Sequence, residues 1–244
     1  MKIVATIEAR MTSSRLPGKV LLTANGQPML HHLVRRLRHV PSLEDIVLAT
    51  TVNAMDDSLV EFARRSGIRC FRGSEEDVML RVIGAAESIQ TDVIVEITGD
   101  CPLIDPLIVE QAIRMFLHNT CDYLGNAVIR SYPDGMDTQV FRLETLRRSA
   151  AMTNDPLDHE HVTLHIRNHP ELFPPLHLLA PPDEHWPELG LTLDEQADYE
   201  LLKKIIEYFD EAHPYFTCRE VIALLREKPE WVEINREVKR KGAA

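Results

Sequence analysis

The sequence predicts an α/β fold built on a doubly wound, mostly parallel sheet. Apolar strand segments alternate with amphipathic helical segments through the first hundred residues, and strands joined by helices of that length need parallel crossovers. The chain has 244 residues, of which 44% are hydrophobic and 27% charged, so it can bury one substantial core and is not disordered. In such a sheet, ligands bind at the carboxyl ends of the strands.

The strands of the first half are short runs rich in Ile, Val and Ala, too short for helices. Apolar residues spaced three and four apart mark the helices between them, and breakers such as Pro41 and Gly67 end these helices. The predicted strands are 3–7, 46–52, 68–71 and 93–97, with helices at about 30–37, 59–63 and 79–86.

The second half begins with a helix at Asp105-Pro106, because Asp caps a helix and Pro suits its first turn. The pattern then becomes mixed, and a capping box at 217–220 starts the last helix. The predicted strands are 123–128, 138–141 and 191–193, and the helices are 143–152, 159–168 and 195–212. We expect one domain over 1–228, an extended proline-rich arm within about 130–190, and a tail at 229–244 whose basic run 239–241 is solvated.

Charge and composition exclude several classes of protein. The net charge of -11 disfavours nucleic-acid binding, which depends on clustered Lys and Arg. No segment approaches a membrane span or a signal peptide, so we expect a cytoplasmic protein without a membrane partner. The four cysteines are widely spaced and indicate neither a disulfide framework nor a zinc site.

A polar loop at 8–19 follows the first strand and carries three cations, Arg10, Arg15 and Lys19. Backbone N–H groups and these side chains could surround phosphate oxygens at the ligand end of the sheet. The loop is not a P-loop, since Val20 follows Lys19, and the chain contains no G-x-G-x-x-G. We therefore predict an anion site of another kind.

Two carboxylates are candidate metal ligands. Asp100 follows the fourth strand and Asp194 follows the short predicted strand 191–193, so both should reach the same crevice. Mg²⁺ prefers such oxygen ligands and leaves other positions to water and phosphate. We expect the two carboxylates to lie close enough to share one ion, whereas Asp105 is only a helix cap.

Two further clusters could contact a substrate. The segment 132–137 is a turn that presents carboxylates, and 158–165 is rich in histidine. The H-E-x-x-H pattern fails at Thr163, which argues against a zinc hydrolase.

Six stretches together resemble the cytidylyltransferases related to CMP-sugar-acid synthetases, within them the group like spore coat polysaccharide biosynthesis protein F. They are A-R-M-T-S-S-R-L-P-G-K-V at 9–20, F-R-G-S-E-E-D-V at 71–78, I-T-G-D-C-P-L-I-D-P at 97–106, Y-P-D-G-M-D at 132–137, D-H-E-H-V-T at 158–163 and L-T-L-D at 191–194. The resemblance implies the nucleotide-diphospho-sugar transferase fold, which is GT-A-like and Rossmann-like. It also implies transfer of CMP from CTP to a small acidic acceptor with loss of pyrophosphate, by an enzyme that is commonly a homodimer.

The resemblance also assigns roles to residues of this chain. Two positions depart from the family pattern: Glu8 stands where Gln is usual, and Gln139 where Glu is usual. The nucleotide would be held by Arg10, Ser13, Arg15, Lys19, Arg72, Ser74 and Asp77, the acceptor by Tyr132, Asp134, Asp137, His159, Glu160 and His161, and Mg²⁺, with Mn²⁺ as a substitute, by Asp100 and Asp194. Among these, Arg10, Lys19 and Asp100 would take part in catalysis.

Two other functions compete with this one. A glycosyltransferase of the same fold would use a nucleotide-sugar donor and a D-x-D motif, which 99–102 does not provide. A non-catalytic nucleotide-binding module would bind CTP tightly without turnover.

Overall fold

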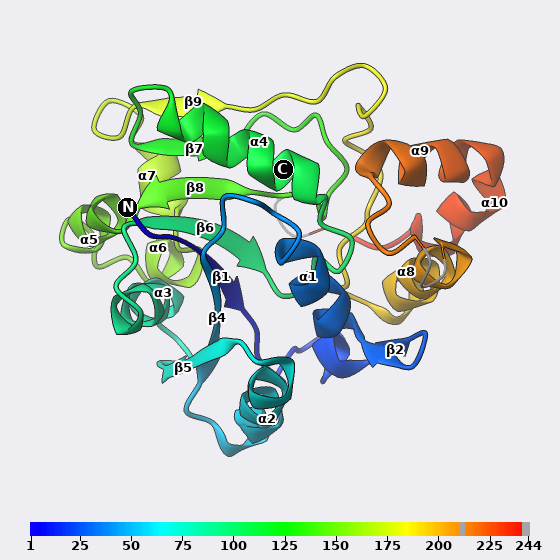
Figure 1. Cartoon of the computed structure of the whole chain (residues 1–244), viewed down its shortest axis with the longest axis horizontal. Helices are drawn as coiled ribbons and strands as arrows, with labels where there is room; N and C mark the ends of the chain where they lie inside the picture. Colours follow the sequence, from blue (N-terminus) through cyan, green and yellow to red (C-terminus); the bar gives the residue numbers. More distant parts are fainter. Residues whose placement is uncertain (210–212, 241–244) are drawn as a thin grey trace.

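The computed structural model describes residues 1–209 and 213–240. Its main sheet has seven strands in the order β5-β4-β1-β6-β8-β7-β9 (Figure 1). β5, β4, β1 and β6 are parallel neighbours, as the alternating pattern predicts. The predicted fold class, α/β with a mostly parallel, doubly wound sheet, is confirmed.

The first half of the chain forms the parallel part of the sheet. A small antiparallel pair, β2 and β3, follows the loop after β1, and the sequence analysis did not predict it. The elements are β1 (Ile3–Glu8), a 3₁₀ turn η1 (Lys19–Leu21), β2 (Thr23–Ala24), β3 (Gln27–Pro28), α1 (Met29–Leu37), β4 (Asp45–Thr51), η2 (Ala54–Asp56), α2 (Asp57–Ser66), β5 (Arg69–Gly73), α3 (Val78–Ser88) and β6 (Val93–Thr98).

The second half adds antiparallel strands and the remaining helices. β8 lies antiparallel to both β6 and β7, and β9, from the proline-rich arm, pairs with β7 in parallel. The elements are α4 (Pro106–Leu117), β7 (Tyr123–Gly125), β8 (Gln139–Arg142), α5 (Leu143–Ala150), α6 (Pro156–Glu160), α7 (Leu164–Asn168), β9 (Pro175–His177), α8 (Gln196–Phe209), α9 (Cys218–Glu227), α10 (Pro229–Val232) and η3 (Glu233–Asn235).

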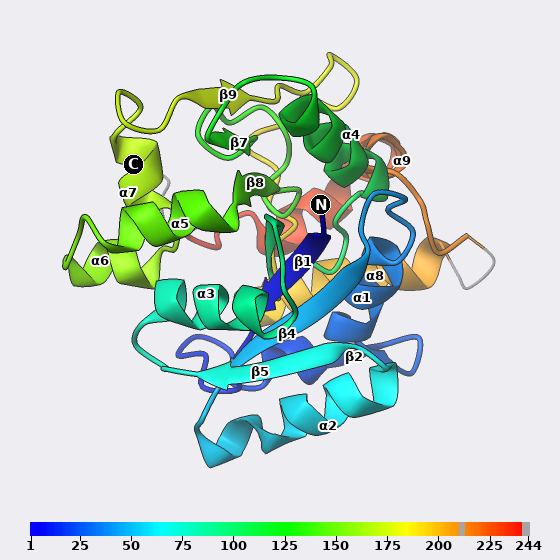
Figure 2. The ribbon, with the colours of Figure 1, turned by 60° about the vertical axis from the view of Figure 1, so that its left-hand side comes forward.

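Helices cover both faces of the sheet because the strands are apolar on both sides. In β1, Ile3, Ala5 and Ile7 join the main core with α1 and α4, whereas Val4 packs toward α3. Figure 2 shows α3 and α1 on opposite sides of the sheet. Helices α8, α9 and α10 lie together at one end of the molecule (Figure 1).

Several predicted boundaries were wrong. The helix predicted at 159–168 is two short helices, α6 and α7, separated by Val162 with φ of 44°. β7 ends at Gly125 rather than 128, and 191–193 is not a strand, since only a single bridge joins Asp134 to Gly190 there. The helix predicted at 195–212 is observed to Phe209, and its last three residues lie outside the described part of the chain.

None of the helices within the described residues is long and apolar enough to cross a membrane.

Candidate functional site

The loop after β1 folds back on itself and points Lys19 inward. Gly18 adopts φ of 70°, a left-handed conformation that suits glycine, and its N–H donates to the Met11 carbonyl at 3.0 Å. The turn η1 begins directly afterwards, and Lys19 is only 9% exposed. The left-handed conformation of Gly18 therefore lets the loop turn so that the Lys19 side chain is buried.

Asp100 is positioned by a close approach of β1 and β6 at their carboxyl ends. The Gly99 N–H donates to the Glu8 carbonyl at 2.9 Å, and a Cβ at position 99 would lie 2.8 Å from that oxygen. Glycine at this position lets Asp100 lie against the polar loop 8–19, which carries Lys19. The Thr98 hydroxyl then donates to an Asp100 carboxylate oxygen at 2.6 Å and fixes its direction.

Asp194 lies beside Asp100, although the residues before it do not form a strand. The Leu193 N–H donates to the Asp100 carbonyl at 2.8 Å, so a loop-to-loop hydrogen bond takes the place of the predicted strand pairing. The prediction that Asp194 follows a strand of the sheet was therefore wrong, while the side chain still arrives beside Asp100.

Lys19 lies between the two carboxylates. Its Nζ donates to Asp100 Oδ2 and to Asp194 Oδ1, each at 2.9 Å, so these two oxygens are at most twice that distance apart. Arg15 Nη2 contacts the same Asp194 oxygen at 2.7 Å. The side chains of Lys19, Asp194 and Asp100 are 11%, 14% and 25% exposed, so the cluster is sheltered but reachable from solvent.

Charge pairing sets the protonation of this cluster. Burial alone would raise the pKa of Asp100, but the Lys19 ammonium and the Thr98 hydroxyl outweigh it and lower that pKa. Burial would likewise lower the pKa of Lys19, and the two carboxylates instead raise it. Asp100 and Lys19 are therefore both charged at neutral pH.

The other predicted nucleotide residues lie near the carboxyl ends of β1 and β5. Arg10 lies 3.6 Å from Glu75, and Ser13 is half-buried in the same loop. Arg72 donates to the carbonyls of Thr51 and Asn53, each at 2.8 Å. Ser74 Oγ accepts from the Asp77 N–H at 3.0 Å, and Asp77 in turn caps α3. Arg72, Ser74 and Asp77 therefore hold the segment from β5 to α3 in place.

Of the predicted acceptor residues, His159 joins two segments far apart in sequence. Its Nδ1 lies 2.8 Å from Asp77 Oδ2, so α6 meets the start of α3, and this hydrogen bond raises the pKa of His159. Glu160 and His161 are exposed beside it. The structure thus brings a predicted nucleotide residue and a predicted acceptor residue into contact.

Within the turn 132–137, Tyr132 is buried in the core, whereas Asp134 lies near the loop of Asp194. Tyr132 is 4% exposed, and its hydroxyl lies 3.5 Å from the Leu179 carbonyl, on the core side of the turn. Asp134 accepts weakly from the Thr192 hydroxyl at 3.4 Å, two residues before Asp194. Burial raises the pKa of Asp137 to about 6, with the neighbouring Asp134 adding to the effect. Asp134 and Asp137 are partly exposed.

Three residues that support the site were missed by sequence reasoning. Asp56 accepts a hydrogen bond from the Met11 N–H at 2.7 Å, and Glu75 accepts one from the Thr12 hydroxyl at 2.7 Å. Both therefore hold the polar loop 8–19 from other segments of the chain. Arg240, predicted to be solvated, instead donates to the buried Asp198 at 2.7 Å; that prediction was wrong, and Lys241 lies outside the described residues. No local pattern marks such long-range partners.

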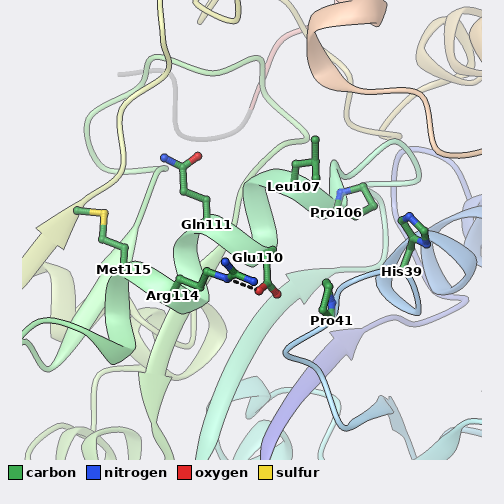
Figure 3. Close-up of a pocket in the computed structure, with 8 residues that line it drawn as sticks. All are labelled: His39, Pro41, Pro106, Leu107, Glu110, Gln111, Arg114 and Met115. Atoms are coloured by element: carbon green, nitrogen blue, oxygen red, sulfur yellow. Dashed lines mark hydrogen bonds and ion pairs between the residues drawn. The ribbon is translucent and has the colours of Figure 1, made fainter.

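A separate hollow of about 730 Å³ lies beside α4 (Figure 3). It is lined by that helix and by His39 and Pro41, from the loop that enters β4 at the amino edge of the sheet. Its arginine, Arg114, already pairs with Glu110 at 2.6 Å. The hollow therefore lies at the opposite edge of the sheet from the Lys19 cluster, and the arginine that lines it is already paired.

No group of three or more His, Cys, Asp or Glu side chains within residues 1–209 and 213–240 converges as a metal site. The two carboxylates around Lys19 could thus supply only part of the shell of an ion, with water or phosphate oxygens as the remaining ligands.

The family model of cytidylyltransferases matches residues 4–229, nearly the whole chain. The chain belongs to the cytidylyltransferase family. It is therefore an enzyme of the nucleotidyltransferase class, and the match includes every predicted site residue.

Two similar proteins cover nearly all of this cytidylyltransferase. A solved cytidylyltransferase from Leptospira borgpetersenii is 32% identical with a TM-score of 0.92, covering 98% of this chain and 100% of its own. Spore coat polysaccharide biosynthesis protein SpsF from Bacillus subtilis is 35% identical over 93% of this chain and 95% of its own length.

A third similarity concerns the fold alone. A solved CMP:2-keto-3-deoxy-manno-octonic acid synthetase in complex with CTP is 20% identical with a TM-score of 0.62, covering 85% of this chain and 99% of its own.

Proposed function

We propose that this cytidylyltransferase moves CMP from CTP to a small acidic sugar or related acceptor and releases pyrophosphate, in the synthesis of a surface polysaccharide precursor. The observation that carries the proposal is the Lys19 ammonium between Asp100 and Asp194, at the ligand edge of the sheet. SpsF, a spore coat polysaccharide protein, supports the pathway, and membership of the cytidylyltransferase family supports the nucleotide.

The chain would act mainly by positioning and by neutralising charge, as in other nucleotidyl transfers. Lys19 and Arg15 would leave their carboxylate partners and bind triphosphate oxygens, because a charged phosphate offers each cation a stronger partner. Arg10 and Ser13, in the same loop, would complete the anion site. An oxygen of the acceptor, held by the segments 132–137 and 159–161, would attack the α-phosphorus in line with the leaving pyrophosphate.

The donor set suits a hard divalent cation. Asp100 and Asp194 already share one positive charge, and both supply the oxygen ligands that Mg²⁺ prefers. Mg²⁺ or Mn²⁺ bound there would neutralise charge on the phosphate oxygens. Lys19 would then be free to turn toward the nucleotide.

A pyrophosphate-release assay tests this function. The four nucleoside triphosphates are each incubated with Mg²⁺, the enzyme and a pool of sugar acids, with reactions lacking acceptor as controls. We expect release with CTP that depends on the acceptor. A preference for UTP or a purine triphosphate contradicts the proposed donor, and tight CTP binding without turnover across the pool supports a non-catalytic module instead.

We also propose a homodimer. On the proline-rich arm Phe173 and Leu178 are buried, whereas Leu172 and Leu179 are 42% and 52% exposed and leave apolar surface for a partner subunit. Light scattering at micromolar concentration should give twice the mass of one chain, and the mass of a single chain would exclude the dimer.

A further inference from the structure

The last described residues of the chain fold back onto the loops that carry the candidate site. The Lys239 carbonyl accepts a hydrogen bond from Arg15 Nη1 at 3.2 Å. Arg240 Nη1 donates to the Thr192 hydroxyl at 3.0 Å, and its Nε lies 3.9 Å from Asp134. This segment therefore contacts three parts of the site: the polar loop 8–19, the loop of Asp194 and the 132–137 turn.

Asp198 connects Arg240 to the backbone at Asp194. Asp198 is fully buried, and its Oδ2 accepts the N–H groups of Asp194 at 3.1 Å and Glu195 at 2.9 Å. Its Oδ1 accepts from Arg240 Nη2 at 2.7 Å and from Asn235 Nδ2 at 2.8 Å. A buried carboxylate needs a cation and full hydrogen bonding, and this one receives both from the carboxyl-terminal segment.

The absence of a side chain at Gly190 leaves room for the Arg240 guanidinium. A Cβ at position 190 would lie 2.0 Å from Arg240 Nη2, so the guanidinium rests directly against the Gly190 backbone. Asn235 Nδ2 donates to the carbonyl of the same glycine at 2.9 Å. Asn235 and Arg240 thus contact the start of the loop 190–195 directly, and through Asp198 they hold its end.

We propose that Arg240 is a positioning residue, which acts through Asp198 and Thr192 to keep Asp194 turned toward Lys19 and in register with Asp134. This rests on the proposed function, in which Asp194 helps to hold the metal. Arg240 itself touches neither Lys19 nor Asp100 among the contacts of the described residues; its effect passes through the loop backbone.

Three variants of the full-length enzyme separate positioning from simple loss of charge. Arg240→Ala removes the whole guanidinium, and Arg240→Lys keeps the charge but cannot contact Asp198 and Thr192 as a fork. Arg236→Ala is the matched control, since Arg236 lies in the same segment, is 65% exposed and pairs with the exposed Glu233. Gly190→Ala displaces the arginine without removing it.

The readouts are Mn²⁺ binding to the nucleotide-free enzyme by electron paramagnetic resonance, and kcat and KM for CTP. We expect Arg240→Ala to weaken Mn²⁺ binding and kcat about 10–100-fold, the usual effect of losing an outer-shell partner. Arg240→Lys should recover part of the loss, Gly190→Ala should resemble Arg240→Ala, and Arg236→Ala should resemble the wild type.

Arg240→Ala with wild-type Mn²⁺ affinity overturns the proposal, even if its melting temperature falls, because a purely structural role predicts that result. If Arg240→Ala does not fold, Gly190→Ala and Arg240→Lys decide by the same criterion. The Mn²⁺ measurement needs no substrate, so a wild-type enzyme that binds Mn²⁺ but releases no pyrophosphate from CTP contradicts the proposed function and leaves the test of Arg240 intact.

Discussion

Two groups of buried carboxylates lie near the same edge of the sheet and differ in their counter-charges. Asp100 and Asp194 share the Lys19 ammonium, and the pKa of Asp100 is lowered. Glu8 and Glu96 lie on the face of the sheet covered by α3, and neither carboxylate oxygen of Glu8 has a hydrogen-bond partner within residues 1–209 and 213–240.

The pKa values of the second group move the other way. Burial, with Glu96 as a nearby negative charge, raises the pKa of Glu8 well above its usual range. Burial also raises the pKa of Glu96 to about 7, although Arg167 opposes the shift. Burial penalises the charged forms of Asp100, Glu8 and Glu96 alike, and at Asp100 contact with the Lys19 ammonium and the Thr98 hydroxyl reverses the outcome. The comparison thus distinguishes carboxylates kept charged from carboxylates that can hold a proton.

The largest test of this comparison removes a charge from the first group. Asp100→Asn or Asp194→Asn should lower turnover by about 10²–10³-fold, because each removes an oxygen anion from the proposed metal site while the fold persists. Turnover is measured by pyrophosphate release over a series of Mg²⁺ concentrations. Losses in the double variant should be less than the product of the single losses if both side chains serve one ion. Wild-type turnover in either variant would remove that carboxylate from the mechanism.

Metal removal belongs to the same test. EDTA should stop the reaction, and added Mg²⁺ or Mn²⁺ should restore it, because Asp100 and Asp194 are proposed to hold a hard divalent cation. Continued turnover in EDTA would contradict a role for the ion.

Lys19→Ala removes the ammonium that Asp100 and Asp194 share and leaves Asp194 paired with Arg15. The variant should use CTP about 10–100-fold less well, since a charged hydrogen bond to phosphate contributes about 1.5–3 kcal/mol. Lys203→Ala is the control, because Lys203 is 41% exposed and its ion pair, with Glu207 at 3.8 Å, lies on the exposed surface of α8. Equal turnover of the two variants would exclude Lys19 from nucleotide binding.

Lys19→Ala should also change how the unfolding free energy depends on pH. The pKa of Asp100 is lowered in the folded enzyme, so its pairing stabilises the fold above its unfolded pKa of about 3.9 and is lost as pH falls through the folded value. The difference in unfolding free energy between wild type and Lys19→Ala should therefore shrink on acidification below about pH 4. A difference that grows there would show that the pair is not what Lys19 stabilises.

Glu96→Gln tests the second group. A raised acid pKa means that the unfolded chain releases its proton first, so stability should fall from about pH 4.5 to pH 7 and stay low above it. The variant should be more stable than wild type at pH 8, by on the order of 2 kcal/mol, and equal to it at pH 4. Urea unfolding at both pH values measures this, and a less stable variant at pH 8 would show that Glu96 is charged and well paired.

The smallest expected effect concerns His159, whose partner Asp77 raises its pKa. A raised histidine pKa stabilises the fold below about pH 6.5 and ceases to do so as pH rises through the folded value. His159→Asn should lose up to about 1 kcal/mol at pH 6 and almost nothing at pH 9, because the pair is partly exposed. His161→Asn, at an exposed neighbour, is the control, and equal losses in both variants would contradict the pairing.

Sequence reasoning predicted the parts of the fold that local spacing controls. The four parallel strands follow from apolar runs, and Asp105 was correctly assigned as the cap of α4. The convergence of Lys19 and Asp100 follows from the rule that parallel strands present their carboxyl ends at one edge.

What sequence reasoning missed depends on partners far along the chain. Asp194 looked like the end of a strand because Leu191 and Leu193 are apolar, yet they are buried in a loop held by Asp100, Asp198 and Asn235. Arg240 looked solvated because its neighbours are basic, and its carboxylate partner lies 42 residues away. Long-range hydrogen bonds of this kind leave no periodic trace in the sequence.

The loop between β7 and β8 has a consequence for how such enzymes can diverge. It is closed at its base by Asn126 and Thr138, whose backbone and side-chain bonds join the ends of the two antiparallel strands. Beyond this closure, Ser131 bonds to the arm at Ala180 and Trp186, on the opposite side of β8 from β1. Mutations at Ser131 are therefore transmitted to the arm, whereas Asp134, in the same loop, is hydrogen-bonded through its backbone to Leu189 and Leu191 and so connects to the loop of Asp194. Natural selection can therefore alter the end of this loop at Ser131 with less effect on Asp194 than a change at Asp134 would have.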